Sequence, residues 1–157
     1  MTVDTTAVMT VAGLMELAAR TAPKVKGVDT ILVRILTGNE IQTLADRLAE
    51  TGERRKTGFF VRDAKNIAAC DACVIKRKKR TTDFSGPNCS VRMTDLGIAL
   101  GSAVKTAQIH NVDNRIMYSG GTAALDLGLL GKDCIVAYAI PLSATGKNIF
   151  FDREVAK

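Results

Sequence analysis

Three of the chain's four cysteines lie between positions 70 and 89, close enough in sequence for their thiolates to hold one metal ion or cluster. Cys70 and Cys73 form a Cys-x-x-Cys pair, and Cys89 follows a basic run. Structural zinc sites usually join two such pairs, and a four-iron cluster usually takes several ligands from one short loop. This set is incomplete. The sequence therefore leaves two interpretations open: buried thiols, or an iron–sulfur or zinc site at Cys70, Cys73 and Cys89, within one chain or across a dimer.

A polar segment follows the last apolar stretch and could bind a phosphate group. It contains Ser143, Lys147 and Asn148, and Arg153 comes shortly after it. It is not a Walker loop, because the first glycine and the Ser or Thr after the lysine are missing. Hydroxyl, amide and cationic groups at the C-terminal end of a strand still supply the donors that phosphate oxygens accept. The alternative is a polar exit loop without a ligand.

Most of the excess positive charge comes from five consecutive basic residues, Lys76 to Arg80. The net charge is +6, so this run leaves only +1 for the rest of the chain. A basic loop could contact an acidic protein or nucleic acid, which defines a non-enzymatic interaction module as one alternative. Nucleic acid is the less favoured partner, because aromatic residues make up only 4% of the chain. Lys24 and Lys26 would bind phosphate only if the fold brings them to Lys147 and Arg153.

The composition predicts a single domain, residues 1–157, in the cytoplasm. Apolar residues make up 46% of the chain and charged residues 24%, as in an ordinary globular protein. No uncharged apolar stretch approaches the ~20 residues of a membrane span, and the first residues lack the pattern of a secretion signal. In a reducing compartment we expect the cysteines to be thiols or metal ligands rather than disulfides.

Apolar periodicity predicts helices and strands that alternate along the chain. Strands are predicted over residues 30–37, 72–75 and 134–142, with an extended segment at 115–118 and a turn at 119–121. Helices are predicted over residues 8–20, 39–48, 94–109 and 122–131, with Asn39, Gln42 and Thr122 in capping roles, and Asp63 is predicted to cap a short helical turn. This order predicts an α/β (α+β) fold with helix–sheet–helix layers around an open or mixed sheet.

The predicted helix at 94–109 contains two glycines, Gly97 and Gly101. Each glycine inside a helix costs about 1 kcal/mol relative to alanine. We therefore expect another backbone to approach this helix closely.

Six segments of the chain resemble an uncharacterised family of ferredoxin domain-containing proteins of anaerobic bacteria and archaea. They are residues 17–27, 59–66, 86–89, 95–107, 112–119 and 140–153. Members of that family typically carry a Cys-Gly-x-Cys-Gly loop and a further cysteine. In this chain only Cys89 corresponds to one of those cysteines. The resemblance therefore implies a form in which the 4Fe-4S ligand loop is incomplete.

A weaker resemblance concerns the fold and points to the flavin nitroreductases. A helix that ends in Ala-Pro, a helix rich in small residues, a Gly-Gly pair and a final strand with a Lys…Arg tail are similar to that fold. The resemblance implies a homodimer that binds FMN at the subunit interface, although the usual basic N-terminal motif is absent here. It assigns Lys24, Lys26, Lys147 and Arg153 to the phosphate and Gly120 and Gly121 to the space around the ring.

These features support three hypotheses about function. The first is a homodimeric, redox-related protein that binds a flavin or another phosphorylated ligand near Lys147. The second is an iron–sulfur or zinc protein, and the third is the interaction module with its basic loop. No general base, nucleophile or acid pair stands out, so no reaction is named and the sequence leaves open whether the protein is an enzyme.

Overall fold

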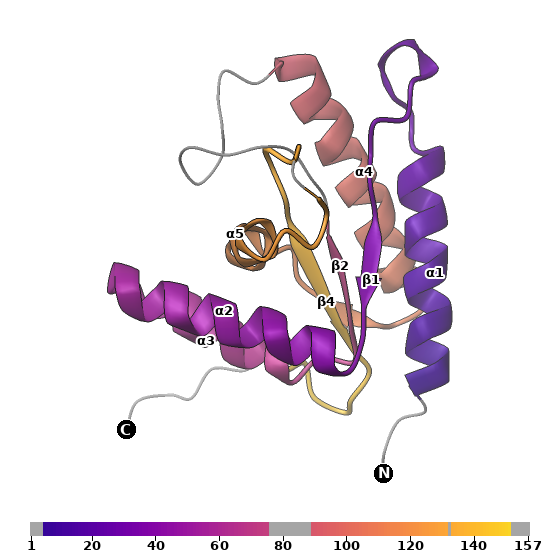
Figure 1. Ribbon diagram of the computed structural model, residues 1–157. Helices are drawn as coiled ribbons and strands as arrows, with labels where there is room; N and C mark the ends of the chain where they lie inside the picture. Colours follow the sequence, from indigo (N-terminus) through magenta and orange to yellow (C-terminus); the bar gives the residue numbers. More distant parts are fainter. Residues whose placement is uncertain (1–4, 76–88, 132, 152–157) are drawn as a thin grey trace.

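The computed structural model describes residues 5–75, 89–131 and 133–151, which form a four-stranded sheet between two layers of helices (Figure 1). The basic run 76–80 and Arg153 lie outside the described residues. The helices are α1 (Thr5–Thr21), the 3-10 helix η1 (Val25–Gly27), α2 (Asn39–Arg55), α3 (Gly58–Ala68), α4 (Ser90–Ile109) and α5 (Tyr118–Asp126), and the strands are β1 (Arg34–Leu36), β2 (Ala72–Ile75), β3 (Asp113–Asn114) and β4 (Ala139–Ser143).

The strand order is β1-β2-β4-β3, and every pairing among the described strands is antiparallel. Arg34 pairs with Ile75, and Ala72 pairs with Leu142. This corrects the expected mixed sheet. The chain runs to the far end of the sheet with α4 and returns along residues 113–117, which pair with β4 from Ser143 back to Ala139. Strand β4 therefore enters the sheet at the end where β2 leaves it (Figure 1).

Strand β2 packs against helices on both faces, and its side chains alternate between them. Ala72 and Val74 belong to the apolar cluster under α1 and α4. Cys73 and Ile75 belong to the cluster under α2, α3 and α5. All four residues are therefore buried, which explains why a short continuous apolar run was enough to predict residues 72–75 as a strand. The expected helix–sheet–helix layers are confirmed.

The predicted strands at 30–37 and 134–142 are longer than the strands that form, 34–36 and 139–143. Because β2 has four residues, it can pair with only a few residues of each neighbour. Helix 8–20 is confirmed within α1, and helix 94–109 is confirmed within α4, which begins four residues earlier at Ser90.

The predicted caps differ from the structure. Asn39 is the first residue of α2 and follows Gly38, whose φ is 48°, and no side-chain cap hydrogen bond forms there. Gln42 donates to Asp46 one turn later at 2.7 Å instead of to the backbone. The prediction failed because a local pattern does not distinguish a cap from a first-turn residue.

Three further predictions place residues at a helix end or in a turn, but the structure places these residues inside helices. Asp63 lies in the middle of α3, and residues 119–121 belong to α5 rather than to a turn. Thr122 does not cap a helix, because its hydroxyl donates to the Ser119 carbonyl at 2.7 Å within α5. Pairs of glycines usually indicate a turn, but here tertiary packing places them in a helix.

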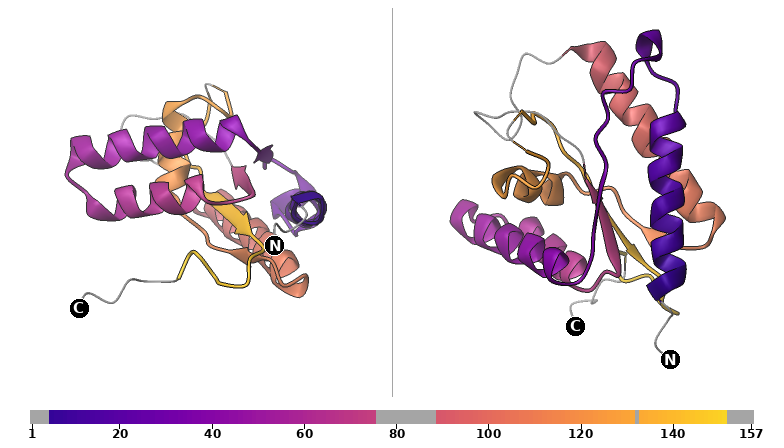
Figure 2. Two further views of the ribbon diagram at one scale, coloured as in Figure 1. Left: turned by 90° about the horizontal axis from the view of Figure 1, so that it is seen from below. Right: turned by 45° about the vertical axis from the view of Figure 1, so that its right-hand side comes forward.

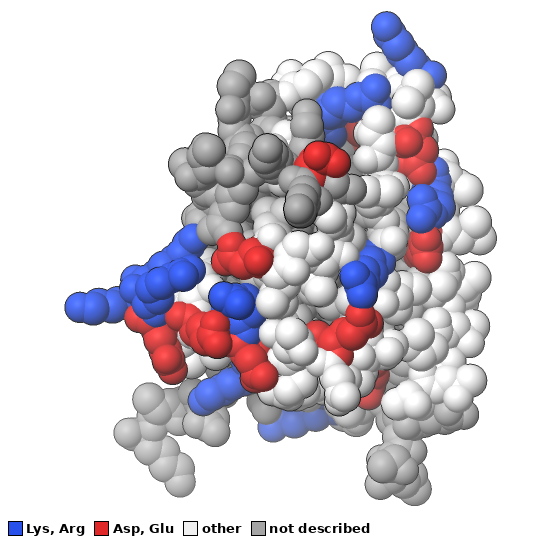
Figure 3. All heavy atoms as spheres, in the orientation of Figure 1, with Lys and Arg blue, Asp and Glu red and all other residues white. Residues whose placement is uncertain are grey.

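The two helical layers carry different surfaces. Helix α2 has seven charged residues among its seventeen, whereas α1 has two among seventeen. Figure 3 shows Lys, Arg, Asp and Glu side chains gathered over α2, and a largely uncharged surface over the lower part of α1. In Figure 2, α2 and α3 lie side by side on one face of the sheet and α1 on the other. Every helix in the described ranges is too short or too polar to cross a lipid bilayer.

Candidate functional site

The loop that follows β4 holds most of the predicted phosphate-binding residues that the structure describes. Ser143 ends β4 fully buried, and its hydroxyl has no hydrogen-bond partner among the described residues. The Thr145 hydroxyl donates to the Lys147 carbonyl at 2.6 Å, which closes a tight turn. Lys147 is exposed on this turn. A cation and an unsatisfied hydroxyl therefore lie within five residues at one end of the sheet.

Asn148 fixes the end of this loop to the neighbouring edge strand. Its amide nitrogen donates to Asp113 Oδ1 at 2.9 Å, and its oxygen accepts the backbone N–H of Phe150 at 3.1 Å. Asp113 belongs to β3 and pairs with Ser143. The contacts of Asn148 hold the polar loop against the sheet.

Lys24 and Lys26 lie at the opposite end of the molecule from this loop. They follow α1 and precede β1, near the end of the sheet where β1 begins, whereas the loop after β4 lies where β1 ends (Figure 1). Within one chain, the structure therefore does not bring these lysines to Lys147. Contact between them requires a second subunit.

Lys24 already has several partners within its own chain. Its ammonium group donates to the carbonyls of Ala19 at 2.8 Å, Arg20 at 2.6 Å and Ala22 at 2.9 Å. It also lies 3.6 Å from Asp29, and its side chain is only 3% exposed. Cations near a helix C-terminus stabilise the unpaired carbonyls there, so Lys24 caps α1.

Gly120 and Gly121 allow α5 to pack closely against the chain around β4. A Cβ atom on Gly121 would lie 1.8 Å from the Ala137 carbonyl oxygen, and one on Gly120 would lie 2.7 Å from the Ala139 Cβ. The space beside both glycines is therefore filled by their own chain. This close packing within the chain is enough to explain why both residues are glycines, and a flavin ring beside them is not needed for that explanation.

The cysteines of the predicted metal site lie in two different environments. Cys70 and Cys73 are buried in the apolar cluster under α2, α3 and α5, whereas Cys89 is exposed at the start of α4. Burial raises the pKa of Cys70 to about 12, and burial together with the charge of Cys70 raises the pKa of Cys73 well above its usual value. Metals bind the thiolate. Burial disfavours the thiolate form of Cys70 and Cys73 and therefore disfavours metal binding by both residues.

Among the described ranges, no three His, Cys, Asp or Glu side chains are placed to hold a metal ion. The site at Cys70, Cys73 and Cys89 thus does not form within this part of the chain. A site completed by a second subunit stays a prediction.

A buried carboxylate in α3 connects segments that sequence reasoning did not combine. Asp63 is 4% exposed. The Ser119 hydroxyl donates to its Oδ2 at 2.6 Å, and the Arg62 guanidinium donates to its Oδ1 at 3.0 and 2.7 Å. Arg115 lies 3.9 Å from the same oxygen. In the sequence, the only indication of this cluster was that its residues lie in two segments, 59–66 and 112–119, that resemble the ferredoxin-domain family.

Arg115 extends this cluster to the end of the described chain. Its guanidinium donates to the Phe150 carbonyl at 3.4 Å and lies 5.6 Å from the centre of the Phe151 ring. Asp63 and Arg115 therefore help to position the loop that carries Lys147.

A second buried carboxylate, Asp95, fixes the segment that contains the Ala-Pro sequence. It accepts the backbone N–H of Val25 at 2.9 Å and lies 3.4 Å from the Arg92 guanidinium. Arg92 also donates to the Val28 carbonyl at 3.2 Å. The contacts of Asp95 hold η1 against α4.

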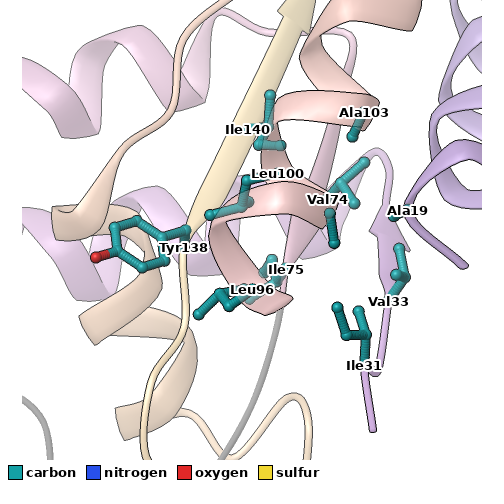
Figure 4. A pocket seen from close by; sticks show the side chains of 11 residues that line it. Ala19, Ile31, Val33, Val74, Ile75, Leu96, Leu100, Ala103, Tyr138 and Ile140 are labelled. Atoms are coloured by element: carbon teal, nitrogen blue, oxygen red, sulfur yellow. The ribbon is translucent and has the colours of Figure 1, made fainter. Parts of the chain in front are cut away.

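An apolar cavity lies between the sheet and the α1/α4 layer (Figure 4). Its lining side chains come from α1, residues 31–33, β2, α4 and β4, and Tyr138, just before β4, turns its hydroxyl away from the others (Figure 4). Its volume of about 20 Å³ is close to that of one water molecule. A flavin ring does not fit there, and the void reflects packing around the small residues Ala19, Ala99 and Ala103.

Residues 85–153 match the model of a family described as "Uncharacterized protein containing a ferredoxin domain". An uncharacterized protein of Archaeoglobus fulgidus is 38% identical in an alignment of 169 positions, gaps included, that covers 92% of this chain and 90% of that protein. This agrees with the family that residues 17–27 to 140–153 resemble.

Solved nitroreductases share the fold. A variant of the FMN- and NADPH-dependent nitroreductase NfnB from sphigopyxis sp. strain HMH superposes with a TM-score of 0.67 at 15% identity, over 100% of this chain and 86% of that one. The FMN-dependent nitroreductase NfnB of Mycobacterium smegmatis, in complex with NADPH, gives 0.66 at 12% identity, over 88% and 78%. The nitroreductase-like fold predicted from the sequence is confirmed.

Proposed function

The chain belongs to the family of uncharacterised proteins that contain a ferredoxin domain. We propose that it is a redox-related protein that binds a flavin, or another phosphorylated ligand, at the interface of a homodimer. The nitroreductases that share its fold include proteins whose names state that they depend on FMN. Fold alone does not establish function. The proposal therefore depends on the residues at the end of β4.

The Ser143 hydroxyl, which has no hydrogen-bond partner in the described part of the chain, is the observation that carries the ligand proposal. A buried hydroxyl without a partner costs roughly 1–3 kcal/mol, so such a group in a native protein calls for an explanation, and a bound ion or ligand is one. It ends the strand from which the exposed Lys147 and the fixed carboxamide of Asn148 follow. Phosphate oxygens accept hydrogen bonds from such donors and gain most from a cation.

The outer face of α4 supports the proposed interface. Gly97 and Gly101 are exposed one turn apart, and a Cβ atom on either would meet nothing within 4 Å. Nothing in the described chain therefore explains two glycines that each cost about 1 kcal/mol. Close approach of a second backbone explains both, as small residues spaced four apart allow helices to cross closely.

The face of α4 with Gly97 and Gly101 lies in one layer with α1, which packs beside it. Gly13 lies in the middle of α1 with open space beside it, and Leu14 and Leu17 are exposed next to it. Ile98 is exposed between the two glycines of α4. A second copy that covers this layer would bury these apolar side chains, and α2 offers no equivalent surface.

Titration of the purified protein with FMN and with riboflavin, which lacks the phosphate, tests the ligand proposal. We expect Lys147→Ala to weaken FMN binding about tenfold, the loss of one charge-assisted contact, and to leave riboflavin binding unchanged. Lys65→Ala, at an exposed lysine of α3, is the matched control and should change neither.

Equal FMN affinity in the wild type and Lys147→Ala would contradict the assignment of the phosphate to this loop. An absence of FMN binding by the dimeric wild-type protein would contradict flavin binding itself. Iron and zinc analysis of the same anaerobic sample tests the metal alternative.

A further inference from the structure

A cavity of about 420 Å³ lies beside β3, where the end of α4 meets the last described residues. Binding sites for small molecules commonly enclose roughly 300–1,000 Å³, so this cavity is large enough for a ligand. Its lining comes from three separate segments: Gln108 of α4, residues 111–114, and the pair Asn148 and Phe151.

Carboxamide side chains dominate this cavity. The chain contains six asparagines and two glutamines, and four of these eight carboxamides line it, namely Gln108, Asn111, Asn114 and Asn148. Among the residues that the structure describes, Asp113 is the one charged member of the lining. Because the described lining offers neutral donors and acceptors beside a carboxylate, and no cation, it favours an uncharged polar ligand over a phosphate.

Internal hydrogen bonds orient part of this set and leave the rest without partners. Asn114 donates to the Val112 carbonyl at 3.0 Å, and Asn148 donates to Asp113 Oδ1. Asn111 has a φ of 54° at the end of α4, a conformation that asparagine tolerates. The carboxamide of Gln108 has no hydrogen-bond partner within the described ranges, although it faces the cavity.

Phe151 adds an aromatic surface to the polar lining. It is 58% exposed, and the Arg115 guanidinium lies 5.6 Å from its ring centre. Exposed aromatic rings stack on planar heterocycles. A carboxamide can pair with the adjacent donor and acceptor of a base, as asparagine and glutamine do with adenine, and a carboxylate accepts hydrogen bonds from hydroxyl and amino groups.

We propose that this carboxamide-lined cavity binds a neutral nucleoside-like molecule, with its heterocycle on Phe151 and its donor–acceptor edge on Gln108. The site is separate from the phosphate-binding role proposed for Lys147. It holds whether or not the protein binds a flavin, although Asn148 borders both places.

Side-chain amide signals in nitrogen-15 NMR spectra test this directly, with adenosine as the probe and glucose as a sugar without a base. Adenosine should shift the carboxamide signals of Gln108, Asn111, Asn114 and Asn148. Signals of Asn39, Asn66 and Gln42, which lie on α2 and α3, serve as internal controls and should not move. Absent shifts, or equal shifts at the controls, would overturn the proposal, and equal shifts with glucose would overturn the choice of a base.

Gln108→Leu should weaken adenosine binding about tenfold, the typical loss for one bidentate base contact, while the backbone spectrum reports that the fold is intact. Gln42→Leu is the matched control and should bind like the wild type. Lys147→Ala should also leave adenosine binding unchanged, which separates a failure of this proposal from a failure of the phosphate site. Unchanged affinity in Gln108→Leu would exclude the proposed contact.

Discussion

Asp63 shows how one buried side chain can connect segments far apart in the sequence. Its two oxygens accept from Ser119 and Arg62, and Arg115 lies near the same carboxylate. A buried carboxylate is costly unless charges and hydrogen bonds compensate it. The Ser119 hydroxyl is therefore part of the stabilisation of that charge.

Replacing Ser119 by alanine should destabilise the protein by about 1.5–3 kcal/mol, the contribution of a hydrogen bond to a charged group. Urea unfolding of Ser119→Ala against the wild type measures this loss. Ser90→Ala removes an exposed serine hydroxyl at the start of α4 and should have little effect. Equal stability of both variants would mean that Ser119 does not compensate Asp63.

The buried thiols predict a loss of stability at alkaline pH. The folded-state pKa of Cys70 is raised from 9.0 to about 12, and that of Cys73 is raised as well. Above about pH 9 the unfolded chain therefore releases thiol protons that the folded chain still holds. The contribution of these thiols is fully present below pH 9 and is lost as the pH rises toward 12.

The measurement is the free energy of unfolding between pH 8 and the alkaline limit of folding, in the wild type and in the double variant Cys70→Ala and Cys73→Ala. The wild type should lose stability more steeply with rising pH than the double variant. Cys89→Ala, at the exposed cysteine, should keep the wild-type slope. Parallel curves for the wild type and the double variant would show that the two thiols titrate alike in the folded and unfolded states, which would contradict their raised pKa values.

At the residue scale, the sequence predicted which side chains could bind but not which partners they find. The segment with Ser143, Lys147 and Asn148 was identified because polar donors follow an apolar run. The capping role of Lys24 depends on carbonyls that α1 presents at its end, and Asp63 meets Ser119 across 56 residues. Local patterns contain neither piece of information.

At the scale of elements, α5 is set by contact with its neighbours more than by local preference. Two consecutive glycines and a short apolar run suggested a turn followed by a helix. The structure instead uses both glycines as a flat helix face against residues 137–139. By contrast, residues 72–75 were predicted correctly, since burial on both faces produces a continuous apolar run that is visible in the sequence.

Gly121→Ala should therefore be strongly destabilising, by several kcal/mol or with loss of folding, because its Cβ would lie 1.8 Å from a backbone oxygen. Gly58→Ala places the same methyl group at the start of α3, where nothing lies within 4 Å, and should be neutral or slightly stabilising. Thermal unfolding of both variants gives the comparison. A melting temperature of Gly121→Ala close to that of the wild type would contradict the close packing of α5.

At the scale of the whole molecule, α2 is rich in charged residues, whereas the layer of α1 and α4 has fewer of them and three glycines on its outer side. The sequence indicated the glycines of α4, but it could not show what lies beside them. That required the positions of the other described elements, because only the folded chain shows that none of them comes within 4 Å of a Cβ atom placed on Gly97 or Gly101.

Gly101→Leu tests the proposed interface. The leucine has open space within one chain and a better helix propensity than glycine, so the subunit should fold, but its side chain would block a crossing helix. We expect a dimer in the wild type and a monomer in Gly101→Leu by sedimentation. Thr43→Leu adds an apolar side chain to the exposed face of α2 and should remain a dimer. A dimeric Gly101→Leu would move the interface elsewhere.

The strand order also determines when the protein can fold during its synthesis. Strand β4 is the last strand along the chain, yet it lies between β2 and β3 in the sheet (Figure 1). A nascent chain that has left the ribosome only as far as α5 has β1 paired with β2 at most, and the other edge of β2 stays open. Open edges of apolar strands are sites of aggregation. Chaperone binding should therefore persist until residues 139–143 emerge, and a ribosome that stalls before them holds a chain whose sheet cannot close.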